Sequence, residues 1–137
     1  MKLIVCTAKN KGMTFLGKRV SKESVLREKI LKLSRGHRLL MNSYSAKQFD
    51  NVSALTVDEN FLNLANDDDF CFIENVNADI KNISELYIFS WNRDYPADFF
   101  FDIDPKSNGF KRVSSQDFKG SSHDKITLDI YKKSKEK

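Results

Sequence analysis

The sequence is poor in the residues and motifs on which many enzymes depend. Among its 137 residues are two cysteines and two histidines, and none of them has the CxxC or Cys/His spacing of a zinc site. The chain contains no glycine-rich phosphate loop, no HExxH motif, no nucleophile elbow and no acidic cluster with metal-ligand spacing. These absences exclude the common nucleotide-hydrolysing, zinc-dependent and serine-hydrolase classes. We therefore expect no metal and no cofactor.

Long hydrophobic segments are missing as well. No apolar run approaches the roughly 18 residues that a membrane-spanning helix needs, and the N-terminal MKLIVCTAKN is too short and too polar for a signal peptide. Cys6 and Cys71 each lie in an apolar, strand-like run, which favours buried, reduced thiols over a disulfide. We expect a cytoplasmic protein without a membrane partner.

The chain does have enough apolar residues for one core. Hydrophobic residues make up 40% of the sequence and eleven of them are Phe, while 137 residues is the size at which one core forms and a second does not. We expect a single α/β domain over residues 1–131, followed by a charged C-terminal tail over residues 132–137. The composition leaves the oligomeric state open.

The net charge of +4 is distributed unevenly. Basic residues dominate residues 1–38, where the only acids are Glu23 and Glu28, whereas acidic residues dominate residues 50–104. Such asymmetry is typical of a protein with one basic face for a phosphate-rich partner. An ordinary solvated surface with a charged tail is the alternative.

Hydrophobic periodicity predicts strands that alternate with helices and then a terminal antiparallel pair. The clearest helix runs from Lys22 to Leu33, with Ser21 as its N-cap and Gly36 at its C-terminal stop. Short helices are expected within residues 43–49, opened by Ser43 or Ser45, and within residues 59–65. Strands are expected over residues 3–8, 37–42, 51–57, 70–76, 85–91, 110–115 and 125–133, with extended arms within 13–20 and 99–103. This order indicates a single mixed β-sheet with helices on both faces.

The order of elements resembles the dihydrofolate reductase fold over most of the chain. The segments that carry the resemblance are LIVCTAKNKGM at the start, ELYIFSWNRDYPADFFFDIDPKSNGFKRVSS in the second half and TLDIYKK at the end. The resemblance implies a shortened dihydrofolate-reductase-like architecture. By register, it places Glu23 at or next to the acid with which that family holds the pterin.

The cofactor motifs of that family are missing. The resemblance implies a Gly-Arg-x-Thr segment after the second strand and a Gly-Gly pair after a later strand, where only glycine lets the backbone approach a nucleotide closely. Here these places read Asn42-Ser43-Tyr44-Ser45 and Glu74-Asn75, and GKRVSKES lacks the family's Pro-Trp. A carboxylate at Glu74 would also repel an anionic cofactor. We therefore expect that nicotinamide nucleotides do not bind, and a diverged reductase is the third of three functional hypotheses.

A second resemblance points to RNA. The segments GMTFLGKRVS, LLMNSYSAKQF, FSWNRDYPAD and GSSHDKIT resemble short proteins of low-GC Gram-positive bacteria and their mobile elements, some of which carry ribonuclease labels. Small anti-CRISPR proteins with an N-terminal hairpin are a related group. This resemblance implies either an endoribonuclease or factor that promotes RNA cleavage, or a non-catalytic inhibitor whose partner belongs to a nucleic-acid machine.

Two titratable residues are candidates for acid–base chemistry. His123 lies among small residues in a predicted loop and could act as a general acid or base on a phosphodiester, although a plain exposed histidine is the alternative. Glu23, set among cations, could activate a ribose 2′-hydroxyl, or could simply interact with the helix dipole. We predict that Glu23 and His123 form a metal-independent catalytic pair.

Two further groups of residues are candidates for nucleic-acid binding. The first is a basic cluster that could hold phosphates at the end of the N-terminal hairpin: Lys18, Arg19, Lys22 and Arg27. The second offers a stacking ring, an amide and a guanidinium at a strand end, as an unpaired base requires: Trp91, Asn92 and Arg93. A buried core tryptophan is the alternative for Trp91. The sequence thus predicts an RNA-directed protein that uses a basic N-terminal hairpin.

Overall fold

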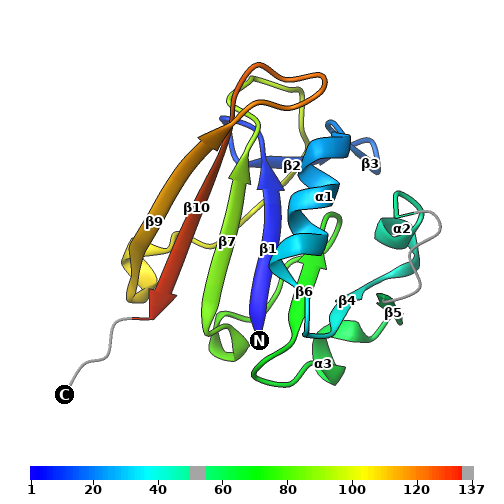
Figure 1. Ribbon diagram of the computed structural model, residues 1–137, viewed down its shortest axis with the longest axis vertical. Coiled ribbons are helices and arrows are strands. Elements are labelled where there is room, and N and C mark those ends of the chain that lie inside the picture. Colours follow the sequence, from blue (N-terminus) through cyan, green and yellow to red (C-terminus); the bar gives the residue numbers. More distant parts are fainter. Residues whose placement is uncertain (50–54, 134–137) are drawn as a thin grey trace.

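The fold is built on one seven-stranded sheet and a smaller three-stranded sheet (Figure 1). The structure, a computed structural model, describes residues 1–49 and 55–133. The strands of the large sheet are β1 (Lys2–Thr7), β4 (Leu39–Met41), β5 (Leu55–Val57), β6 (Phe70–Ile73), β7 (Glu85–Ser90), β9 (Phe110–Phe118) and β10 (Ile126–Lys133). The small sheet contains β2 (Gly12–Phe15), β3 (Lys18–Arg19) and β8 (Phe99–Phe100). The helices are α1 (Ser24–Leu33), α2 (Ser43–Ala46), α3 (Phe61–Leu64) and the 3₁₀ turns η1 (Ile80–Asn82) and η2 (Lys106–Asn108).

The large sheet is mixed, as the sequence predicts. Its strand order is β5-β4-β6-β1-β7-β10-β9. β1 pairs in parallel with β6 and β7, and β4 pairs in parallel with β5 and β6, whereas β10 runs antiparallel to both β7 and β9. β6 is buried along its whole length and β1 along most of it, because strands in the centre of a parallel sheet are covered on both faces.

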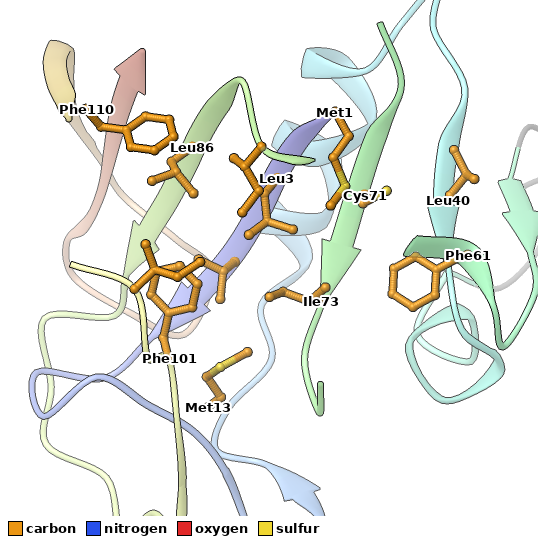
Figure 2. Close-up of a cluster of buried hydrophobic side chains, with 13 residues drawn as sticks. Met1, Leu3, Met13, Leu40, Phe61, Cys71, Ile73, Leu86, Phe101 and Phe110 are labelled. Atoms are coloured by element: carbon orange, nitrogen blue, oxygen red, sulfur yellow. The ribbon is translucent and has the colours of Figure 1, made fainter. Parts of the chain in front are cut away.

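Helices cover both faces of the sheet, and this confirms the predicted α/β class. On one face, Leu26 and Ile30 of α1 pack in a cluster with Ile4 and Phe89 of the sheet. The opposite face carries the cluster drawn in Figure 2, in which Leu3, Cys71 and Leu86 of adjacent strands belong to one cluster with Met13, Phe61 and Phe101. Here the cover comes from the short helix α3, the small sheet and irregular segments. α1, with ten residues, is by far the longest of the described helices.

Several local predictions need correction. α1 begins at Ser24 and Glu23 is its N-cap, so Ser21 does not cap the helix. The chain passes through Gly36 with φ +85°, which confirms the predicted stop. Asn42, not Ser43 or Ser45, caps α2. The sequence predicts a single sheet, whereas the structure has a second, three-stranded sheet in addition to the large one.

Of the two C-terminal strands, β9 is longer than predicted, whereas β10 agrees with the predicted strand over 125–133 to within one residue. β9 continues to Phe118, and β10 continues to Lys133, two residues into the segment that the sequence assigns to a charged tail. The predicted strand over 51–57 is seen only as Leu55–Val57, because its first residues lie outside the described part of the chain. No helix of the described residues is long and apolar enough to cross a membrane.

Candidate functional site

The carboxyl edge of the parallel strands is the natural place for a site in this architecture. Ligands of open α/β sheets bind outside the carboxyl ends of the strands, where the connections leave in opposite directions. At this edge lie the hairpin β2–β3, the start of α1 and the loop between β9 and β10 (Figure 1). The loop, residues 119–125, contains the GSSHD segment, so Glu23 and His123 meet here.

Glu23 is buried and saturated with hydrogen bonds. Its Oε2 accepts from the backbone N–H groups of Val25 and Ser121 at 3.0 and 2.8 Å and from the Ser121 hydroxyl at 2.7 Å. Its Oε1 accepts from the backbone N–H and the hydroxyl of Ser122 at 2.6 and 2.9 Å. Burial alone would raise the pKa of Glu23, but the N–H groups of Ser122 and Ser121 favour the ionised form more strongly and hold the pKa below its usual value.

His123 lies beside Glu23, as the predicted pairing requires. Its Nδ1 is 3.3 Å from Glu23 Oε1, while its Nε2 lies 2.9 Å from the Tyr95 hydroxyl and 3.2 Å from Ser21 Oγ. Its ring stacks on Trp91 with centroids 4.7 Å apart. The side chains of His123 and Glu23 are only 3% and 0% exposed. The residues meet, but in this arrangement both side chains are almost completely closed to solvent, and their catalytic role stays a prediction.

A second closed network fills the neighbouring part of the edge. Arg19 forms a bidentate pair with Glu74, with Nε–Oε2 at 2.9 Å and Nη2–Oε1 at 3.1 Å, and its guanidinium lies 4.6 Å from the centre of the Tyr44 ring. The Asn42 amide donates to Asn75 Oδ1 at 2.8 Å. These are the positions where the resemblance places cofactor glycines. At these positions the side chains therefore form hydrogen bonds with one another. The charge of Arg19 is neutralised by Glu74 instead of being free for a phosphate.

The other cations of the predicted cluster lie around this network. Lys18 and Lys22 are exposed, whereas Arg27 is half-buried on α1. Lys18 and Lys22, together with Arg19, Ser21 and Tyr44, line a surface hollow of about 340 Å³ that we call the hairpin hollow. Because Ser21 also contacts His123, this hollow borders the 119–125 loop.

Trp91, Asn92 and Arg93 lie on the other side of the same loop. Trp91 is only 3% exposed. Its ring is therefore better described as a buried core side chain than as a platform on which a base could stack. Asn92 takes a left-handed φ of +58° and donates to the Lys125 carbonyl at 3.2 Å, while the exposed Arg93 donates to the Ser122 carbonyl at 3.4 Å. All three line a hollow of about 390 Å³ together with Lys9, Lys125 and one acid, Asp124; we call it the lysine hollow.

Sequence reasoning missed several of these residues. Lys9 comes directly after the first strand in TAKNKG, and its position at the carboxyl end of a central strand was a usable signal. Lys125, Tyr95 and the two serines of GSSHD carried no such signal, because contacts between segments distant in the sequence bring them to the site. No group of three or more His, Cys, Asp or Glu side chains suited to a metal occurs within residues 1–49 and 55–133.

The comparisons with known proteins identify the fold. No protein-family model matches the sequence, and no curated protein matches it. Among solved structures, one similar chain is described as dihydrofolate reductase from Enterococcus faecalis complexed with NADP(H) and RAB-propyl. The TM-score is 0.68 at 11% sequence identity, and the alignment covers 98% of this chain and 96% of that chain. At so low an identity the match shows the fold alone, and it confirms the predicted dihydrofolate-reductase-like architecture.

Proposed function

We propose that this protein is a non-catalytic binding module for single-stranded RNA, which it holds on the carboxyl edge of its sheet. The observation that carries the proposal is that two cation-lined hollows flank one loop, while the acid–base pair between them, Glu23 and His123, is buried and fully hydrogen-bonded. The hairpin hollow offers Lys18 and Lys22, and the lysine hollow offers Lys9, Arg93 and Lys125.

The buried pair is better suited to structure than to catalysis. A general base must reach the proton that it removes and needs a pKa near the working pH. Glu23 is covered by the 119–125 loop, and its pKa is held below its usual value by the N–H and hydroxyl groups that surround it. The geometry supports a carboxylate that fastens the loop to the N-terminus of α1 through charge-assisted hydrogen bonds.

The loop also couples the two hollows. Ser21 of the hairpin hollow contacts His123, and Arg93 of the lysine hollow donates to Ser122, the residue before it. A chain of phosphates crossing the loop would thus meet lysines on both sides. Exposed lysines and arginines bind such a backbone by releasing its counterions, without a requirement for sequence.

The test is a titration of labelled single-stranded RNA at several salt concentrations. Two double variants, Lys18→Ala with Lys22→Ala and Lys9→Ala with Arg93→Ala, should each weaken binding and reduce the slope of log K against log salt by about 0.7 per lost phosphate contact. Lys81→Ala is the matched control, because Lys81 is exposed at the opposite edge of the sheet, where a surface hollow includes Met1 and Asn82.

Two outcomes would contradict the proposal. If the wild type does not bind RNA at low salt, or if the control changes the slope as much as the double variants, the surface is not an RNA site and a protein partner becomes the better hypothesis. If pure protein cleaves the RNA in EDTA, the non-catalytic part is wrong and the Glu23–His123 pair must open in solution.

A further inference from the structure

Another cavity lies on the face of the sheet opposite α1. It has a volume of about 340 Å³, within the range of roughly 300–1,000 Å³ that is usual for small-ligand sites. Its walls come from the inward side chains of β1, β7 and β10 and from the segment 101–106 that crosses over them. Ile88, Phe101 and Ile103 provide apolar surface, and the hydroxyls of Ser90 and Tyr131 provide hydrogen-bonding groups.

One carboxylate oxygen in this cavity makes no hydrogen bond within the protein. Asp129 stands on β10 directly opposite Ile88 of β7, so strand alternation turns it toward the cavity and not toward α1. Its Oδ1 is buried and makes no hydrogen bond in the structure, since the nearest cation, Arg112, keeps its Nη1 3.9 Å away. A buried acceptor without a donor is costly. A ligand that brings N–H groups to this oxygen would recover that cost.

Cations mark the mouth of the cavity. Lys9, Lys11 and Lys106 line it, together with one further acid, Asp104. Lys9 and Asn92 belong both to this cavity and to the lysine hollow, so the two spaces are neighbours that share these two side chains. An occupant can therefore place a group rich in N–H donors beside Asp129 and an anionic group among the lysines.

We propose that this cavity is a guanine-nucleotide site, with the base beside Asp129 and the phosphate at Lys9, the residue that the cavity shares with the lysine hollow. Guanine alone among the standard bases presents two adjacent N–H donors, N1–H and the 2-amino group, that match the two oxygens of a carboxylate. Burial, and then the nearby Asp129, raise the pKa of Tyr131, so its hydroxyl keeps its proton and can donate to the guanine carbonyl. The inference rests on the proposed function in one respect: it names an unpaired guanine as the preferred base in the bound RNA.

The first arm of the test uses mononucleotides and the wild-type protein. Calorimetric titration should show that GMP binds about tenfold or more tightly than IMP, which lacks the 2-amino group, because one good polar contact is worth about 1.4 kcal/mol or more. AMP should bind still more weakly. The comparison changes the ligand alone, so it does not depend on how a variant folds.

The second arm uses variants and RNA. Asp129→Asn should abolish the preference for GMP over IMP, while Asp68→Asn, a matched change in an exposed turn, should leave it intact. An oligonucleotide with one unpaired guanine should likewise bind more tightly than the same strand with inosine, and only while Asp129 is present.

The outcomes separate this inference from the proposed function. RNA binding with equal affinity for guanine, inosine and adenine strands, and no preference among mononucleotides, would overturn the guanine site and leave the RNA module standing. GMP binding that depends on Asp129, without any binding of RNA, would support the site for a free nucleotide and overturn the module.

Discussion

Glu23→Gln tests how much the buried carboxylate contributes to stability. Glutamine keeps the length of the side chain and one acceptor oxygen, but replaces the other oxygen by an NH₂ group that can only donate. Whichever way the amide turns, at least one backbone N–H from Ser121 or Ser122 faces a donor, and a serine hydroxyl there must also turn away. With Val25 N–H on the same side as Ser121, two backbone donors lose their acceptor in one orientation.

The expected cost is about 1–3 kcal/mol at neutral pH, because the amide adopts the orientation with its NH₂ group toward Ser122, which leaves one backbone donor unpaired. That is a large part of the total stability of an ordinary domain, about 5–15 kcal/mol. The folded-state pKa of Glu23 is lowered, so its contribution is complete above the unfolded-state pKa of about 4.3 and is lost as the pH falls further. The difference between wild type and Glu23→Gln should therefore shrink below about pH 4.

Denaturant titration followed by tryptophan fluorescence measures this difference. Trp91 is the single tryptophan of the sequence and stacks on His123, so its emission reports on the loop that Glu23 holds. Glu28→Gln is the matched control, because Glu28 lies exposed on the same helix and its replacement should change stability by no more than about 0.5 kcal/mol. A cost below about 1 kcal/mol for Glu23→Gln at pH 7 would refute the reasoning.

Two further predictions concern the same edge of the sheet. Gly120→Ala should destabilise the fold by about 1–3 kcal/mol in the same denaturant titration, because the added methyl would lie 2.6 Å from Glu23 Cδ, and the exposed neighbour Lys119→Ala should be neutral. Millimolar NADPH should leave the melting temperature unchanged, because Arg19 and Glu74 form an ion pair with each other at the place where a cofactor would lie. A rise of several degrees in a thermal-shift assay would show that a nucleotide displaces this pair.

Elements governed by local patterns were predictable. The helix over 22–33 follows from its apolar spacing and from Gly36, both of which act within a few turns. Its first residue was placed wrongly, because Ser21 and Glu23 can both cap a helix and nothing local chooses between them. The choice is made by Ser121 and Ser122, which surround the Glu23 carboxylate from about a hundred residues away.

The site was predictable only in part, for the same reason. The sequence paired Glu23 with His123, and the structure places His123 Nδ1 3.3 Å from Glu23 Oε1, but the burial of both side chains depends on how the 119–125 loop closes, and that is a tertiary property. Arg19 was expected among free cations because nothing in its own segment reveals Glu74, 55 residues later. Trp91 comes directly after β7, and its ring is covered by the stacked ring of His123, which no local pattern reveals.

Glu23→Gln also tests whether Glu23 contributes to RNA binding beyond its role in folding, although one loop serves both. Since the 119–125 loop contacts Ser21 on one side and Arg93 on the other, loosening it disturbs both hollows. Glu23→Gln should then weaken RNA binding in proportion to the unfolded fraction and bind within about twofold of wild type where both proteins are fully folded. Loss of an RNA-cleaving activity under such conditions, with affinity retained, would instead make Glu23 a catalytic residue and would require the loop to open during turnover.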